Sequence, residues 1–182
     1  MYTGVLDFGN QLGSDIFDLL VASDELLLEE LVIFVQKYLI EKQTGWLHRN
    51  FVKVLHTVFQ LESCKQFQDY CLDIVCEDPE PFFNSQNFPT LEKSILLGLF
   101  EREDLQIREI ELWNKLIEWG IAQTFELRGK NMTNLDGWNE KDFMALKETL
   151  NQFISHIRFF EIPSKDFHGR IWPFRKVLPE AL

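Results

Sequence analysis

The clearest regularity in this sequence is an apolar stripe with helical spacing that recurs in three successive segments. In residues 31–39, 51–59 and 67–75, apolar side chains stand at i, i+3, i+4, i+7 and i+8. This spacing places them on one face of an amphipathic helix. Asn50 is a candidate N-cap for the second helix, and only a few residues separate the second helix from the third. The pattern therefore predicts an antiparallel helical hairpin over residues 51–75.

The second half of the chain keeps this helical character between polar breaks. The run Asp-Pro-Glu-Pro at residues 78–81 interrupts a helix, because each proline fixes φ and lacks a backbone donor. Further helices are expected over residues 108–124 and, after a polar loop at 126–138, from an N-cap at Asn139 onward. Strand-like alternation is nearly absent. The sequence predicts an all-α fold of stacked antiparallel helical hairpins, closed by an extended strap over residues 159–182.

The net charge indicates which kinds of partner to expect, and the cysteine content indicates the cellular compartment. With 29 acidic and 18 basic residues the net charge is −11, so the surface repels phosphate backbones, and we expect neither a nucleic-acid nor a membrane partner. No apolar run approaches the ~18 residues of a membrane span, and the first residues do not resemble a signal peptide. The spacing of Cys64, Cys71 and Cys76 fits no zinc motif, and Cys71 falls on an apolar stripe, which indicates a buried thiol. A cytoplasmic or nuclear protein is expected.

No motif for catalysis or cofactor binding is recognisable. The four histidines are His48, His56, His156 and His168. None of them forms an i,i+4 pair or an H-E-x-x-H motif, and no nucleophile elbow, Walker loop or dinucleotide-binding turn is present. The acidic groups near residues 73–80 and 101–104 lack the ligand alternation of a calcium loop. The sequence therefore predicts no cofactor, no metal and no enzyme activity, and an enzyme remains only as a third hypothesis.

Two sets of motifs go beyond periodicity. Tyr2-Thr3-Gly4, followed by the helical run at residues 15–26 and by a helix ending at Tyr38-Leu39, resembles the second half of a BTB (POZ) domain. Phe88-Pro89-Thr90-Leu91, with the helix over 105–119, resembles the BACK domain that follows BTB in kelch-like proteins. The resemblance implies the following division: 1–44, C-terminal part of a BTB domain; 45–125, BACK domain; 126–138, polar loop; 139–182, C-terminal helix and strap of the BACK region.

The resemblance implies a non-enzymatic adaptor that recruits substrates to cullin-RING ubiquitin ligases. Its expected partners are proteins, a cullin and a substrate protein among them, and a homodimer is expected only with the first half of the BTB domain, which this sequence lacks. Carried over from the family, the candidate partner groove is lined by Leu47, Phe51 and Val54. The alternative for these three residues is a place in the buried core. The alternative for the whole chain is a helical spacer between flanking domains that binds no cullin.

Overall fold

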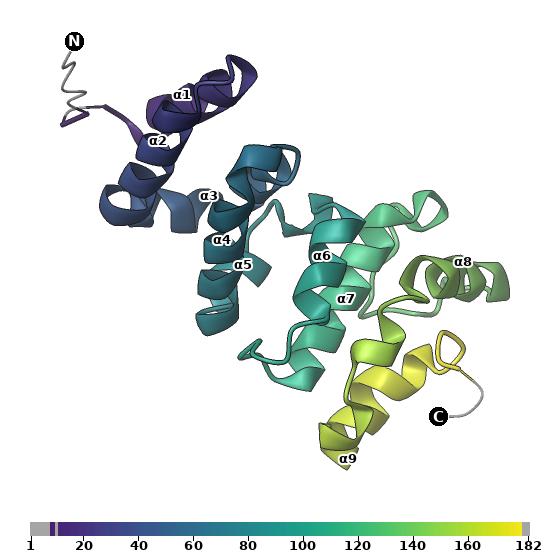
Figure 1. Cartoon of the computed structure of the whole chain (residues 1–182). Helices are drawn as coiled ribbons and strands as arrows, with labels where there is room; N and C mark the ends of the chain where they lie inside the picture. Colours follow the sequence, from purple (N-terminus) through teal and green to yellow (C-terminus); the bar gives the residue numbers. More distant parts are fainter. Residues whose placement is uncertain (1–7, 10, 180–182) are drawn as a thin grey trace, which may run out of the picture. The chain divides into compact units, whose positions relative to one another are not determined.

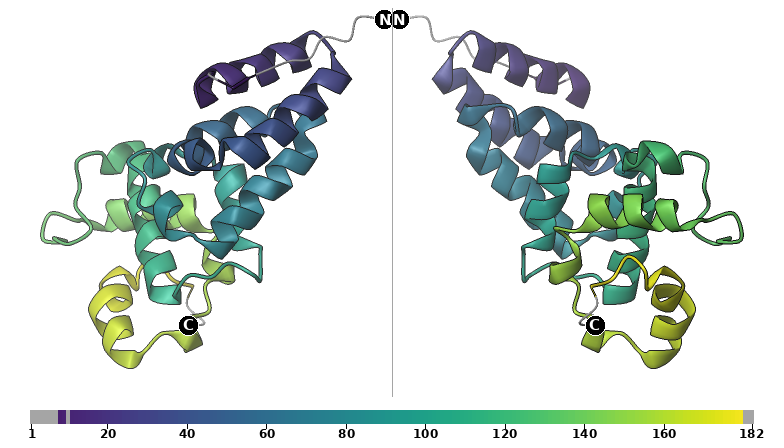
Figure 2. Two further views of the ribbon diagram at one scale, coloured as in Figure 1. Left: turned by 90° about the vertical axis from the view of Figure 1, so that its left-hand side faces the viewer. Right: turned by 90° about the vertical axis from the view of Figure 1, so that its right-hand side faces the viewer.

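Within the residues that the computed structural model describes, 8–9 and 11–179, the fold is all-helical (Figures 1 and 2). The longer helices are α1 (Gly13–Glu25), α2 (Glu29–Lys42), α3 (Thr44–Val58), α4 (Lys65–Glu77), α6 (Lys93–Phe100), α7 (Glu109–Gln123) and α8 (Glu140–Leu150). The short helices are α5 (Glu80–Phe83) and α9 (Ser164–Asp166), and short 3-10 turns join several of the helices. The predicted all-α class is confirmed for this part of the chain, while the stacking of successive hairpins stays a prediction.

Two expectations concern extended or membrane-spanning structure. The Tyr2-Thr3-Gly4 strand of the BTB resemblance lies outside the described residues. Inside them, β pairing is confined to one isolated bridge between Asn131 and Asn134. No described helix combines the length and the apolar character required to cross a bilayer.

The chain divides into two compact units, Met1–Asp73 and Ile74–Leu182, with the division inside α4. This division rests on compactness alone. The boundaries drawn from the family resemblance, at residues 44/45 and 125/126, stay predictions.

In the first unit, α1 and α2 lie side by side (Figures 1 and 2). Phe17 and Leu20 on α1 and Val35 and Leu39 on α2 are buried. Removing an apolar side chain of this size from water stabilises the fold by about 2 kcal/mol. Val35 and Leu39 of the stripe at residues 31–39 therefore supply core side chains, as the spacing predicts, whereas Phe34 of the same stripe is exposed.

The helix α3 begins earlier than the sequence suggests. It starts at Thr44, directly after α2, and Asn50 lies inside it with a non-helical backbone (φ −124°, ψ 15°). The Asn50 side-chain amide donates a hydrogen bond to the Trp46 carbonyl oxygen at 2.8 Å. The predicted role of Asn50 as an N-cap is wrong: its amide competes with the backbone for a carbonyl within the helix, and the residue marks a kink.

The second unit is organised around two tryptophans of α7. Trp113 and Trp119 are buried, and the ring of Trp119 meets that of Phe153 edge-on with centroids 5.1 Å apart. Trp119 Nε1 donates to the Leu91 carbonyl oxygen at 2.8 Å, and Trp113 Nε1 donates to the Arg170 carbonyl oxygen at 3.3 Å. Each indole thus fills the core while its one polar atom finds a backbone acceptor.

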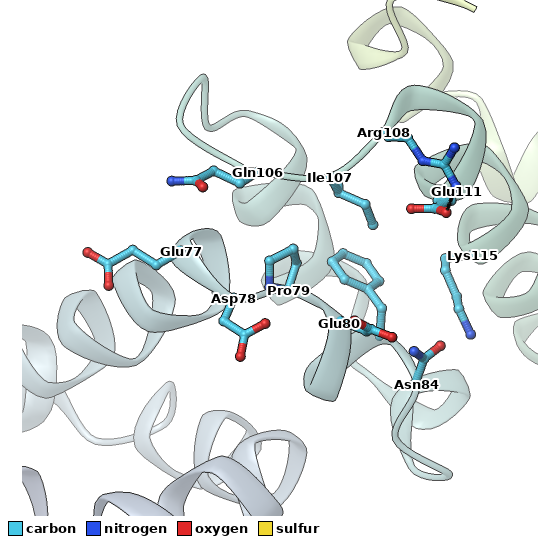
Figure 3. A pocket seen from close by; sticks show the side chains of 11 residues that line it. Glu77, Asp78, Pro79, Glu80, Asn84, Gln106, Ile107, Arg108, Glu111 and Lys115 are labelled. Carbon is cyan, nitrogen blue, oxygen red and sulfur yellow. Dashed lines mark hydrogen bonds and ion pairs between the residues drawn. The ribbon is translucent and has the colours of Figure 1, made fainter.

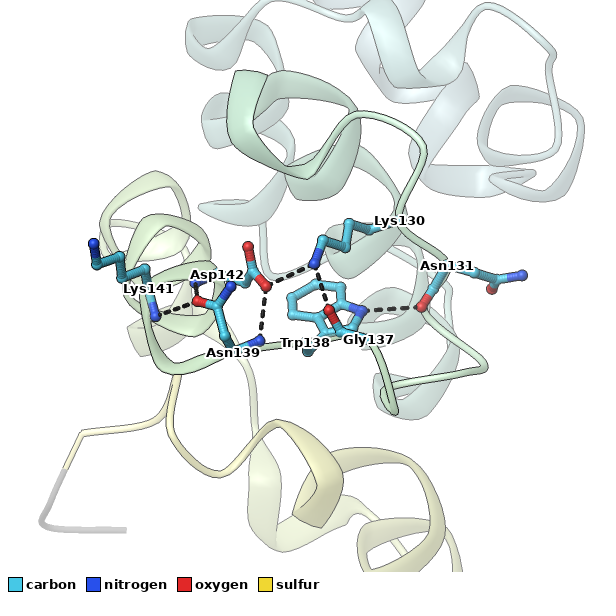
Figure 4. A network of polar contacts seen from close by, with 7 residues as sticks. All are labelled: Lys130, Asn131, Gly137, Trp138, Asn139, Lys141 and Asp142. Atoms are coloured by element: carbon cyan, nitrogen blue, oxygen red, sulfur yellow. Dashed lines mark hydrogen bonds and ion pairs between the residues drawn. The ribbon is translucent and has the colours of Figure 1, made fainter.

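The polar loop before α8 ends in a capping box, shown with its neighbours in Figure 4. Asn139 Oδ1 accepts hydrogen bonds from the backbone N–H groups of Lys141 (2.9 Å) and Asp142 (3.2 Å), and Asp142 Oδ2 accepts from the Asn139 N–H (2.8 Å). Lys130 Nζ donates both to Asp142 Oδ2 (2.8 Å) and to the Gly137 carbonyl oxygen (2.5 Å), which ties the loop to the helix. These bonds lower the pKa of Asp142, the Asn139 N–H first and Lys130 second. The predicted cap at Asn139 is confirmed.

A buried carboxylate fixes the start of the C-terminal segment. Glu109, at the start of α7, is buried, and Arg158 donates to its two oxygens through the backbone N–H (3.0 Å) and Nε (2.6 Å). Arg158 Nη2 lies 2.6 Å from the same carboxylate. Because charge-assisted, bidentate pairs are strong and directional, this contact holds residue 158 against α7.

The extended strap predicted for residues 159–182 is wrong within the described part. The chain there forms short helical turns: α9, a π-helical turn at Phe167–Ile171 and a 3-10 turn at Trp172–Phe174. Such turns satisfy their backbone hydrogen bonds locally, which extended chain without a sheet neighbour does not do. The ring of Phe174 packs edge-on against Trp138 at 5.8 Å, so the segment still covers the second unit.

Candidate protein-binding surfaces

The three residues of the expected partner groove are buried. Leu47, Phe51 and Val54 all lie on α3 with almost no exposed surface. Their burial agrees with the core alternative, and their place in a partner groove stays a prediction. The exposed positions of the same helix include Arg49 and Lys53, on either side of the kink at Asn50.

A cavity of about 470 Å³ opens in the second unit beside the start of α7 (Figure 3). Phe83 and Ile107 give it an apolar part, and the carboxylates of Asp78 and Glu80 line one side. The backbone N–H of Gln106 donates to the Cys76 carbonyl oxygen at 3.0 Å, which holds the segment before α7 against the end of α4.

The cations of this cavity are both engaged in ion pairs. Arg108 pairs with Glu111, and this hydrogen bond raises the pKa of Arg108. Lys115 Nζ lies 3.0 Å from Glu118. The cavity therefore offers charges of both signs over an apolar patch, which suits a polypeptide segment.

A second cavity, of about 450 Å³, is built around the Arg158–Glu109 pair. Arg102 also lines it and donates to Asp104 from Nε (2.9 Å) and Nη2 (2.6 Å). These contacts, with the hydrogen bond as the larger cause, lower the pKa of Asp104. Arg102 and Arg158, which line this cavity, are both held in ion pairs, Arg102 with Asp104 and Arg158 with Glu109.

The three cysteines have raised pKa values, which make their thiols poor nucleophiles. Cys71 is buried, as its position on the stripe predicts, and burial raises its pKa to about 12. Burial also raises the pKa of Cys64, and that of Cys76 to about 11. A thiol with such a pKa carries little thiolate at neutral pH and is a poor nucleophile. Among the described residues, no three His, Cys, Asp or Glu side chains gather closely enough to hold a metal ion.

The turn between α1 and α2 holds three exposed leucines in a row, which sequence reasoning did not single out. Leu26, Leu27 and Leu28 expose 68%, 85% and 46% of their surface. Three consecutive leucines do not fit a helical stripe, and this break in the pattern was the available signal.

Comparisons with protein-family models, with curated proteins and with solved structures found no match to this chain.

Proposed function

We propose that the chain is a non-enzymatic protein-interaction module of the BTB–BACK kind that recruits proteins to a cullin-RING ubiquitin ligase. Its partners would be a cullin and a substrate protein, in the cytoplasm or the nucleus. The support is the resemblance of its motifs together with the way those motifs pack.

The observation that carries this proposal is the contact between the two BACK-like motifs. Phe88 and Leu91 of the first motif are buried, and Trp119 of the second motif donates its indole hydrogen bond to the Leu91 carbonyl oxygen at 2.8 Å. Gln123 Nε2 adds a second bond, to the Pro89 carbonyl oxygen at 2.8 Å. Phe88 and Leu91 of the first motif and Trp119 of the second, which were matched to the family separately, thus belong to one buried contact with a hydrogen bond across it.

The direct test is binding to the N-terminal domain of a cullin, measured by calorimetry. Two forms are compared: this chain alone, and this chain joined behind the first half of a BTB domain from a kelch-like protein. We expect the joined form to bind. If neither form binds, the adaptor proposal fails and the helical-spacer alternative is favoured.

The site is tested with surface variants, because substitution of Leu47, Phe51 or Val54 would disturb the core. Arg49→Glu with Lys53→Glu reverses the charge of the exposed side of α3, while Lys141→Glu with Lys147→Glu makes the same change on the exposed side of α8. Loss of binding with the first pair alone supports docking at α3. Equal loss with both pairs would show a response to net charge.

A further inference from the structure

The turn between α1 and α2 forms an apolar hollow on the surface of the first unit. The hollow, of about 590 Å³, is lined by Leu27, Leu28, Leu31 and Phe34 together with Glu29 and Glu30, and we call the four apolar residues the leucine hollow. Phe34 remains 42% exposed although its ring lies beside that of Phe8. Large apolar side chains grouped around a depression are typical of a binding surface, whereas single exposed ones are ordinary.

The backbone of Leu27 is strained in order to place this side chain. Leu27 follows α1 as the residue after its C-cap and has φ 56°, and it is the one non-glycine residue with positive φ in the described part of the chain. Its N–H donates to the Asp24 carbonyl oxygen (2.9 Å), and the Leu28 N–H donates to the Ser23 carbonyl oxygen (2.8 Å). These two bonds define a Schellman motif, and glycine is the usual residue at this position. A leucine here carries both steric strain and exposure to water, a combination that a binding role explains.

The charged residues that line the leucine hollow are all acidic. Glu29 and Glu30 line it directly, and a neighbouring depression of about 610 Å³, which shares Leu27 and Leu28, is lined by Asp24 and Glu62. No lysine or arginine is among the described residues that line either depression. Two copies of the chain meeting through this face would bring like charges together, so the rim disfavours a symmetric dimer. It favours a partner that carries positive charge.

We propose that the leucine hollow binds a segment of another protein in which apolar side chains are flanked by lysine or arginine. The apolar side chains enter between Leu27 and Phe34, while the cations meet the carboxylates of the rim. This inference rests on the proposed protein-interaction role, but it concerns a surface distinct from the exposed side of α3 and needs no cullin.

A synthetic peptide provides the probe. It has about fourteen residues, with leucine at i, i+3, i+4 and i+7 and lysine elsewhere, and its binding to the full chain is followed by fluorescence anisotropy. We expect Leu27→Gly to weaken binding about tenfold, because it removes an exposed apolar anchor while keeping a backbone that glycine favours. Glu29→Gln with Glu30→Gln is expected to weaken binding by a similar factor at low salt, and the difference should shrink as salt screens the exposed charges.

Matched controls separate this surface from the overall negative charge. Glu101→Gln with Glu103→Gln removes two exposed carboxylates from the second unit and is expected to leave binding within about twofold of the unmodified chain. A peptide with glutamate in place of lysine is expected not to bind.

Several outcomes would overturn the proposal. They are absence of binding by the lysine peptide, equal weakening by the control pair, and equal binding of the glutamate peptide. Self-association of the full chain in sedimentation that Leu27→Gly abolishes would assign the hollow to a second copy instead. Cullin binding is measured separately, so failure here leaves that test standing, and the reverse holds too.

Discussion

Replacement of Leu27 by glycine is expected to raise the free energy of unfolding by about 0.5 kcal/mol. The left-handed conformation costs a residue with a Cβ about 1–2 kcal/mol, and glycine escapes that cost. Glycine also raises the conformational entropy of the unfolded chain, which lowers the free energy of unfolding by about 0.4–1 kcal/mol. Because 85% of the Leu27 surface is exposed, losing the side chain forfeits only about 0.3 kcal/mol of burial. The strain relief is the largest of the three contributions, so the sum is positive.

Alanine at the same position provides the comparison. Leu27→Ala keeps the Cβ and its strain while losing the small burial, so its stability should fall by about 0.3 kcal/mol. Urea unfolding followed by circular dichroism measures both variants, with the midpoint shifting at unchanged slope. Hydrogen exchange of the α1 and α2 amides then shows whether the change belongs to the first unit. If glycine proves no more stable than alanine, left-handed strain does not govern this turn and the argument is refuted.

Three further predictions follow from contacts in both units. Gly120→Val should destabilise the second unit by about 2 kcal/mol in urea unfolding, because a Cβ there would lie 2.6 Å from Leu150 Cδ2. Unchanged stability would show that α8 moves aside at no cost in free energy. The lowered pKa of Asp142 means that its carboxylate stabilises the fold at neutral pH and that this contribution is lost as pH falls below about 4. Asp142→Asn should therefore be less stable than the unmodified chain at pH 7, and the difference should shrink as pH falls through the lowered pKa of Asp142; a pH-independent difference would contradict the assignment. Cys71, whose pKa is about 12, should react with a thiol reagent at pH 8 only as fast as the fold opens, and a rate unaffected by mild urea would contradict its burial.

The sequence predicted well those features that depend on local pattern. The stripe at residues 67–75 contains Phe67, Cys71 and Val75, and all three are buried as the spacing requires. Asn139 forms the capping box that its position before an amphipathic segment indicates. In both cases the decisive interactions lie within one helix or on one of its faces, so neighbouring letters carry the information.

The errors arise where contacts distant in sequence, or a choice between two local bonds, decide the structure. Asn50 can cap a helix or bond back to a carbonyl within one, and the helix that starts at Thr44 selects the second option. The C-terminal segment reads as extended chain because of its prolines, yet it forms short turns there, and Trp113 donates a hydrogen bond to the Arg170 carbonyl oxygen in one of them. Such partners cannot be read from the segment itself.

The same reasoning explains why the sequence pointed to the residues of the candidate groove and not to those of the leucine hollow. Periodicity selects side chains that avoid water, so residues taken from a stripe, such as Phe51 and Val54, are the ones most expected to disappear into the core. A binding surface must keep apolar side chains in water, and part of the leucine hollow lies where the helical pattern breaks. The consecutive leucines around Leu27 break it in sequence, and the positive φ of Leu27 breaks it in structure. The leucine hollow combines both kinds of residue, because Leu31 and Phe34 belong to the stripe at residues 31–39 whereas Leu27 and Leu28 lie before it.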